Sequence, residues 1–336
     1  MRIGRFSAAL PLVLMSVLIL AVGAFATVRQ DAFLTSFNLN NLLLLTMPLA
    51  LVSLGQTCAL LVGGFDVSVA ALMTFCVVLA SYTMSFETSG WALFPGGLAL
   101  IAVGLATGIF NAVIICVLKL PSIIATLGTF SILQGASLLL RDHPEGPISS
   151  DVVSGLTRSV SFVPIAFIAV VVLSVLGDVW LYRTRTGLAL RAVGLDQTSS
   201  RRLGMATGHM LFLAFVLCSV MASLAGFYLA AQVQIGSPLI GSFGLESIAC
   251  AVLGGASLAG GRGSFVGALL AALFLSLIDN VLPLFHQPTE YAEITIGALI
   301  LLALVLYQGP ELLARIRASR SRVGRPPAGQ GEAPAA

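Results

Sequence analysis

The residues best suited to chemistry in this sequence are arginines gathered in one polar stretch, residues 183–208. The stretch contains Arg183, Arg185, Arg191, Arg201 and Arg202 in an otherwise apolar chain. Asp196 can accept hydrogen bonds from the free N–H groups that begin a helix, and Gly204 can end that helix after Leu203. Arginines in the last turn suit the negative end of the helix dipole. The sequence therefore predicts a short cationic helix outside the membrane, which can dock a partner.

Motifs for catalysis are absent from the sequence. A phosphate-binding loop needs a lysine after its glycines, and the single lysine, Lys119, stands between two leucines, so any ATP hydrolysis must occur in a partner. The three histidines, His143, His209 and His286, are far apart and give no metal-ligand spacing. Neither a GxSxG motif nor a pair of acids within one apolar block occurs. We therefore expect no catalytic residue and no metal site, and predict that the chain is not an enzyme.

A second group of polar residues lies within apolar blocks. Such residues are costly in a membrane unless they face another helix or water, so each either bonds a neighbouring helix or lines a solute path. Most of them are amides, which suit an uncharged polar solute better than an ion. The candidate path residues are Asn41, Gln56, Asn111, Gln134, Glu246 and Asn280; Gln232, Gln234 and Asp279 lie in similar blocks.

Membrane spans must carry these residues. Of 336 residues, 58% are hydrophobic and 9% are charged, which is typical of a polytopic membrane protein. Ten apolar blocks predict helices at about 7–28, 40–62, 67–85, 93–118, 121–140, 161–181, 210–231, 244–258, 264–283 and 292–307. We therefore predict an all-α integral membrane protein of about ten transmembrane helices over 1–310, followed by a basic, disordered cytoplasmic tail over 311–336.

The distribution of basic residues predicts the orientation. If the N-terminus is cytoplasmic, ten spans leave both termini inside, and fourteen of the seventeen Lys and Arg residues are then cytoplasmic. Only Arg29, Arg141 and Arg158 fall outside. Basic residues near span ends gather on the cytoplasmic side of membrane proteins. The net charge of +3 is small, and we expect no nucleic-acid partner.

Two glycine-rich turns interrupt the apolar blocks. The first glycine turn, residues 63–68, contains Gly63, Gly64, Asp66 and Ser68. We expect Asp66 or Ser68 to cap the following helix, and Gly64 to adopt a positive φ. The second glycine turn, residues 253–263, contains Gly254, Gly255, Gly260, Gly261 and Gly263.

Together with the arginine stretch, these turns resemble those of permease subunits of ABC importers for monosaccharides, the ribose, xylose and galactose type. The matching segments are LVGGFDVSVAAL at 61–72, TGLALRAVGLDQTSSRRLGM at 186–205 and LESIACAVLGGASLAGGRGSFVGAL at 245–269. The resemblance runs from the first span to about Tyr307. It departs from the family pattern at Gln197–Ser200, where the family has Asn or Glu and paired alanines, and at Ala70, where glycine is preferred.

The resemblance implies a multi-pass permease of the bacterial inner (plasma) membrane that imports a monosaccharide or similar neutral polyol-like solute. Residues 183–208 are then its cytoplasmic coupling loop, with ATPase contacts at Arg191, Gly194, Asp196, Arg201, Arg202, Leu203 and Gly204. The implied partners are a second permease copy or a sister permease, two ATP-binding subunits or one tandem ATPase, and a periplasmic sugar-binding protein. ATP and Mg²⁺ would be bound by the ATPase, and no cofactor by this chain.

Two other interpretations of the sequence stay open. A branched-chain amino acid type of ABC permease shares the coupling-loop pattern but normally lacks the Gly-Gly-x-Asp-x-Ser turn. A proton-coupled secondary carrier would need no ATPase and would depend on Asp279.

Overall fold

The structure is a computed structural model that describes residues 3–239, 241, 243–288, 291, 294–295 and 297–298. The chain divides into two compact units, 1–292 and 293–336, and every element below belongs to the first. The predicted tail, 311–336, lies outside the described residues, as do all but four residues of the predicted tenth span, 292–307.

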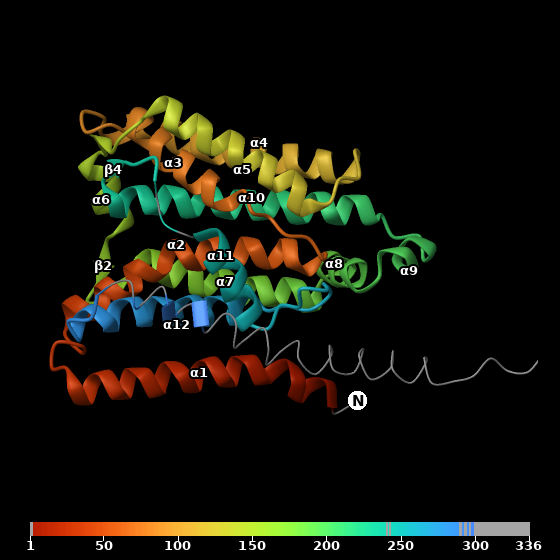
Figure 1. Cartoon of the computed structure of the whole chain (residues 1–336), viewed down its shortest axis with the longest axis horizontal. Helices are drawn as coiled ribbons and strands as arrows, with labels where there is room; N and C mark the ends of the chain where they lie inside the picture. Colours follow the sequence, from red (N-terminus) through yellow and green to blue (C-terminus); the bar gives the residue numbers. More distant parts are fainter. Residues whose placement is uncertain are drawn as a thin grey trace, which may run out of the picture. The chain divides into compact units, whose positions relative to one another are not determined.

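The described part is predominantly helical (Figure 1). Its long helices are α1 (Ile3–Arg29), α2 (Ser36–Leu61), α4 (Phe94–Cys116), α5 (Ser122–Leu140), α7 (Ile165–Arg183), α10 (Thr207–Val233) and α12 (Phe265–Leu284). These seven are long and apolar enough to cross a membrane. The shorter helices are α3 (Val69–Thr83), η1 (Gly90–Leu93), α6 (Ser150–Leu156), α8 (Arg185–Leu195), α9 (Gln197–Arg202) and α11 (Phe243–Leu253). The predicted all-α membrane fold is confirmed.

Two predicted spans are shorter in the structure than in the sequence pattern. The block at 67–85 forms α3, of 15 residues, and the block at 244–258 forms α11, of 11 residues. At 1.5 Å per residue these helices are about 22 Å and 16 Å long. The hydrocarbon core is roughly 30 Å thick, so neither helix crosses it alone.

Glycines end α2 and α11 in the same way. After α2, the Gly63 N–H bonds the Leu60 carbonyl at 2.9 Å and the Gly64 N–H bonds the Ala59 carbonyl at 3.0 Å, while Gly63 has a φ of +75°. After α11, the N–H groups of Gly255 and Ala256 make the equivalent bonds, and Gly255 has a φ of +100°. This Schellman arrangement needs a left-handed residue, which glycine adopts without strain. The predicted eighth span therefore ends at Leu253.

Helix α2 lies at the centre of the packing. Its most apolar stretch is 83% buried, against 17% for those of α1 and α7. It packs against α10, α11 and α12, and α10 also covers α3 and α4. Most of the long helices therefore have a face that the rest of this chain leaves uncovered, whereas α2 has very little such surface.

Short strands join the helix ends that lie opposite α8 and α9 (Figure 1). β1 (Glu145–Pro147) pairs with β4 (Ile235–Gly236), and β2 (Ser159–Val160) pairs with β3 (Val163–Pro164), both antiparallel. A single bridge between Ser85 and Ile148 adds the end of α3 to the first pair. These pairings, which the hydrophobic pattern does not predict, hold the ends of α3, α5 and α10 together.

Candidate coupling and transport site

Asp196 starts α9 as the sequence predicts. Its Oδ1 accepts the N–H groups of Thr198 at 2.8 Å and Ser199 at 3.1 Å, and its Oδ2 accepts the Ser199 hydroxyl at 2.5 Å. The hydroxyl and N–H of Ser199 lower the pKa of Asp196 from its usual value. Because the pKa is lowered, the ionised carboxylate stabilises the cap at every pH above the ordinary carboxyl pKa. This stabilisation is lost only in acid, as the pH falls through the lowered pKa. The cap is therefore intact at neutral pH.

Gly204 ends α9. With a φ of +79°, it donates its N–H to the Arg201 carbonyl at 3.0 Å, and the next N–H, of Met205, bonds the Ser200 carbonyl at 3.0 Å. The predicted cap and stop of this helix are confirmed. The side chains of Arg201, Arg202 and Leu203 are exposed, so the last turn offers two cations and an apolar tip to a partner.

Gly194, near the end of α8, brings the coupling loop against both glycine turns. A Cβ on Gly194 would collide with the Leu61 carbonyl oxygen and lie 2.6 Å from the Gly261 nitrogen. The backbone of Gly261 itself donates to Leu61 at 2.9 Å. Gly260 and Gly261 have φ values of +90° and +77°. The three segments that carry the family resemblance therefore meet at one end of the helices.

The other glycines of the second turn also mark close approaches. A Cβ on Gly254 would overlap the backbone of Gly267 in α12, and a Cβ on Gly267 would overlap the backbone of Gly254. A Cβ on Gly263 would lie 3.2 Å from Thr57 Cγ2, on α2. Glycine at 254 and 267 lets the end of α11 and the start of α12 pack with their backbones nearly in contact, and Gly263 leaves room for the side chain of Thr57.

In the first glycine turn, Asp66 and Ser68 do not cap α3 as expected. Asp66 Oδ1 accepts the N–H of Ser68 at 3.0 Å and its hydroxyl at 2.5 Å, and the Ser68 side chain makes no capping bond. Asn111 Nδ2, on α4, donates to Ser68 Oγ at 2.9 Å, and Thr129, on α5, donates to Asn111 Oδ1 at 2.6 Å. The turn residues instead begin a buried polar network joining α3, α4 and α5.

Hydroxyls of α5 also satisfy the backbone of this turn. Ser122 Oγ accepts the N–H of Phe65 at 3.1 Å, and Thr126 Oγ1 accepts that of Val67 at 3.1 Å. Irregular backbone is tolerated at membrane depth only where protein groups bond it. The first glycine turn is therefore fixed to α5.

Gly64 does not have the positive φ that we expected from the sequence. The positive φ belongs to Gly63, and Gly64 has none. A Cβ on Gly64 would instead lie 2.7 Å from Cζ of Phe215, a ring buried in α10. Gly64 is constrained by the space beside that ring and not by its backbone angle.

The candidate path residues do not converge on one cavity. Asn280 forms a reciprocal amide pair with Asn38, at 3.1 Å and 3.0 Å, which ties α12 to α2. Gln134 donates to the Pro238 carbonyl at 2.9 Å. Asn41 is exposed near the start of α2, and Glu246 is half-buried on α11. Helix-to-helix bonding therefore accounts for Asn280. Gln134 is bonded to the segment between β4 and α11, and Asn111 belongs to the network described above.

Gln56 is the candidate placed deepest in the helix core. It is fully buried on α2, its Oε1 accepts the Cys218 thiol at 3.8 Å, and its Nε2 has no partner among the described residues. A buried amide with a free donor is rare and costs free energy. Of the predicted path residues, Gln56 has the clearest capacity to bond a further group.

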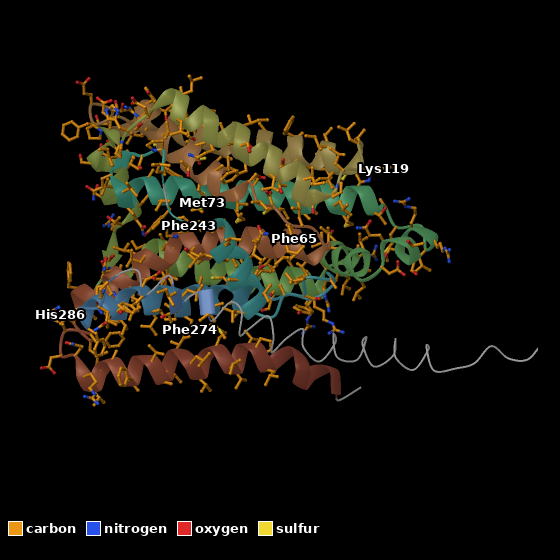
Figure 2. All side chains as sticks on the ribbon, in the orientation of Figure 1. Phe65, Met73, Lys119, Phe243, Phe274 and His286 are labelled. Atoms are coloured by element: carbon orange, nitrogen blue, oxygen red, sulfur yellow. The ribbon has the colours of Figure 1, made fainter. Side chains whose placement is uncertain are left out.

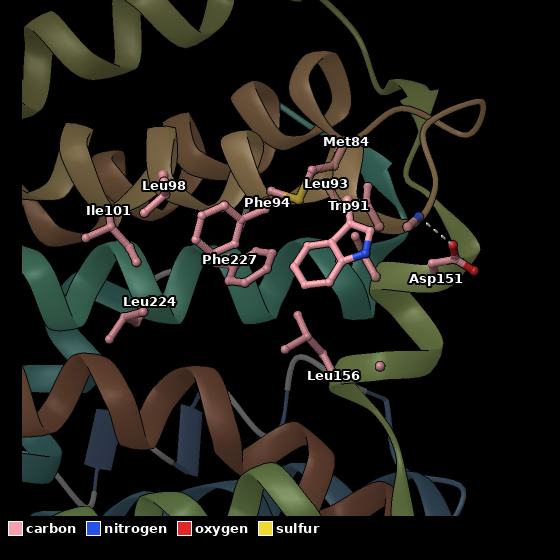
Figure 3. Close-up of a pocket in the computed structure, with 14 residues that line it drawn as sticks. Met84, Trp91, Leu93, Phe94, Leu98, Ile101, Asp151, Leu156, Leu224 and Phe227 are labelled. Atoms are coloured by element: carbon pink, nitrogen blue, oxygen red, sulfur yellow. Dashed lines mark hydrogen bonds between the residues drawn. The ribbon is translucent and has the colours of Figure 1, made fainter.

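A cavity of about 480 Å³ opens between α4, α10, η1 and α6 (Figure 3). Trp91, Phe94 and Phe227 line it, and Asp151 lies at its edge, where it accepts the Gly90 N–H at 3.2 Å. Its walls are almost wholly apolar, so it does not suit a hydroxyl-rich solute. A second apolar cavity, of about 450 Å³, lies between α2, α7, α10 and α12. The candidate path residues line neither.

The sequence pattern missed two polar residues near the coupling loop. Asp178, on α7, bonds Ser264 and Phe265 at the start of α12, and Tyr182, on the same helix, bonds the Gly263 carbonyl just before it. Asp178 lies inside the predicted block at 161–181, and a charged residue within a span was the available signal.

An exposed, capped cationic helix beside a buried helical core is the arrangement that a membrane subunit would need to work with a partner outside the membrane. The chain belongs to the family described as branched-chain amino acid transport system / permease component, which matches residues 38–304.

Two relatives are named autoinducer 2 import system permease protein LsrC. That of Enterobacter sp. (strain 638) is 34% identical over 293 residues, 86% of this chain and 84% of the relative. That of Yersinia pseudotuberculosis serotype O:1b (strain IP 31758) is 35% identical over 267 residues, 78% of this chain and 74% of the relative. No solved structure matches the chain significantly.

These findings confirm the predicted resemblance to permeases of monosaccharide-type ABC importers. The chain is a transport subunit, not an enzyme, and a multi-pass protein of the inner membrane. An ATPase and a periplasmic binding protein are its partners in general terms. The family description includes the branched-chain amino acid class, but the relatives favour the sugar-type importer over that class and over the proton-coupled carrier.

Proposed function

We propose that this chain passes a small neutral polyol-like solute, of which autoinducer 2 is the first to test, through a path shared with a second permease copy or a sister permease. ATP and Mg²⁺ bind to a separate ATPase pair or tandem ATPase. The observation that carries the coupling part of the proposal is the exposed cationic helix α9, joined through Gly194 to both glycine turns.

The proposal places α8 and α9 in the cytoplasm, with about ten spans and both termini inside. The start of α1 lies at the same end of the helices as α8 and α9 (Figure 1), and so does Lys119, opposite His286 (Figure 2). The arginines of the coupling loop and Arg262 add to this end. Arg29, Arg141 and Arg158 belong to the other, as the rule for basic residues requires.

Solute choice is tested with the complete complex in sealed vesicles. With ATP supplied to the ATPase and binding protein on the opposite side, we expect uptake of autoinducer 2 or ribose, no uptake of leucine, and no change when an ionophore abolishes the proton gradient. Leucine uptake would instead assign the branched-chain amino acid class. Uptake without ATP would exclude an ATP-driven importer.

Reversing the charge of α9 tests the coupling role. We expect Arg201→Glu together with Arg202→Glu to weaken binding of the ATPase at least tenfold, since a tenfold loss needs only about 1.4 kcal/mol and like charges facing one another across an interface cost several kcal/mol. Insertion and yield of the permease should not change, because both side chains are exposed. The matched control is Arg158→Glu, an exposed arginine at the opposite end. Wild-type binding and uptake by the double variant would remove α9 from the interface.

A further inference from the structure

The start of α12 is held by a carboxylate from another helix. Asp178, on α7, accepts the Phe265 N–H at 2.7 Å through Oδ1, and the Ser264 hydroxyl at 2.7 Å and Val266 N–H at 3.3 Å through Oδ2. The first turn of α12 has no acidic residue of its own. Asp178 therefore supplies the negative charge that a helix N-terminus favours.

The first N–H groups of α12 are all bonded as a result. These groups have no partner within a helix. Asp178 takes those of Phe265 and Val266, and Ser264, the residue before the helix, accepts that of Gly267 at 3.0 Å. Charge-assisted bonds of this kind are shorter and stronger than neutral ones. The position of α12 is thus fixed to α7 by directional contacts as well as by packing.

Two more side chains extend these contacts to the coupling loop. Tyr182, one helical turn after Asp178, donates its hydroxyl to the Gly263 carbonyl at 2.8 Å. The guanidinium of Arg191, on α8, stacks over the Tyr182 ring at 4.4 Å, and its Nε donates to the Gly261 carbonyl at 3.4 Å. Contacts therefore follow the backbone from Gly261 into the first turn of α12.

The connection between α7 and α8 is short, and the two helices are closely packed at it. Thr184, the one residue between these helices, donates its hydroxyl to the Trp180 carbonyl at 2.7 Å and accepts the Gly187 N–H at 3.1 Å. A Cβ on Gly187 would lie 2.6 Å from Leu181 Cα, so the two helices meet with almost no space. The end of α7 and the start of α8 are thus in direct contact.

We propose that Asp178, Tyr182 and Arg191 form a clamp that makes α8, the end of α7 and the start of α12 move as one body during transport. The inference rests on the proposed function, in which the ATPase docks on α9. Because α12 packs against the buried helix α2, the clamp carries ATPase movement into the helix core. Asp178 is a positioning residue and acts through the start of α12.

Removing the charge of Asp178 tests the clamp in the complete complex. We expect Asp178→Asn to bind the ATPase normally and hydrolyse ATP at nearly the wild-type rate, while the ATP consumed per solute imported rises about tenfold, within the range for residues that carry coupling. Asp178→Glu should recover much of the coupling. Asp31→Asn, the same change at an exposed loop carboxylate, should change nothing.

A fall in hydrolysis and uptake in equal proportion would show that Asp178 only supports folding. Hydrolysis and uptake that both stay at the wild-type rates would show that it has no part in coupling. Both results are read against wild-type uptake, so a complex that imports no solute at all fails the proposed function first and is distinguished from failure of the clamp.

A distance measurement checks the common movement directly. Spin labels are placed at Leu188, on α8, and at Arg262, both exposed, after Cys116→Ser removes the half-buried cysteine. We expect the same distance in the nucleotide-free and ATP-bound wild-type complex, and a broader distribution in Asp178→Asn. A distance that changes on ATP binding in the wild type would overturn the clamp.

Discussion

Gly194→Ala is expected to prevent assembly of a transport-competent permease. The added methyl group would meet the Leu61 carbonyl oxygen and the Gly261 nitrogen, which are backbone atoms and cannot turn away. Moving either group to make room would strain the 2.9 Å bond that the Gly261 N–H donates to the Leu61 carbonyl. Overpacking of this kind costs about 3 kcal/mol or more. The measurements are the thermal unfolding midpoint in detergent and ATP-driven uptake, both of which should fall strongly.

The control for this variant is Gly208→Ala. Gly208 lies in the first turn of α10, and a Cβ there would meet nothing within 4 Å. Alanine also has the higher helix propensity, so this variant should be as stable as the wild type or slightly more so. If Gly194→Ala keeps wild-type stability and uptake, α8 does not approach the two turns as closely as the structure places it.

Asn111→Leu is expected to destabilise the permease by about 2 kcal/mol, from the loss of two hydrogen bonds at a fully buried site. Leucine has the same number of side-chain heavy atoms with the same branching, but leaves the Ser68 and Thr129 hydroxyls without this amide. The network joins three helices, so the loss should loosen α3, α4 and α5 together. The free energy of unfolding in detergent by denaturant titration measures the effect.

A double-mutant cycle with Thr129→Val isolates one bond of this network. Valine keeps the shape of threonine and removes only the hydroxyl, which donates to Asn111 Oδ1 at 2.6 Å and also lies 3.2 Å from the Ala125 carbonyl of its own helix. We expect Thr129→Val to cost about half as much as Asn111→Leu, and the double variant to cost less than the sum. Additive effects would mean that the two side chains do not share a bond.

Local patterns in the sequence predict local structure well. Asp196 and Gly204 define the ends of α9 because capping and left-handed glycine depend on neighbouring backbone groups alone. Apolar runs likewise locate the long helices. The lengths of α3 and α11 are harder to predict than the positions of the long helices, because apolar residues continue past the ends of these two helices into buried turns.

Contacts between distant segments could not be predicted from one sequence. The sequence around Asp178 does not predict its hydrogen bond to Phe265, because the two residues are 87 positions apart. The pairing of Asn38 with Asn280 spans 242 residues. The constraint on Gly64 comes from Phe215, which the sequence cannot place beside it. Only tertiary packing determines which polar residues meet.

The deep burial of α2 has a consequence for the order in which the chain is synthesised. Its main neighbours α10, α11 and α12 all follow residue 206, so they do not exist when α2 leaves the ribosome. Yet Thr46, Ser53 and Thr57 each donate their hydroxyl to the carbonyl four residues earlier in α2 itself, at 2.6–2.8 Å. These hydroxyls are therefore already hydrogen-bonded within α2 when it enters the bilayer. Gln56, whose thiol partner Cys218 is made 162 residues later, is the polar side chain of this stretch that must wait for its neighbour.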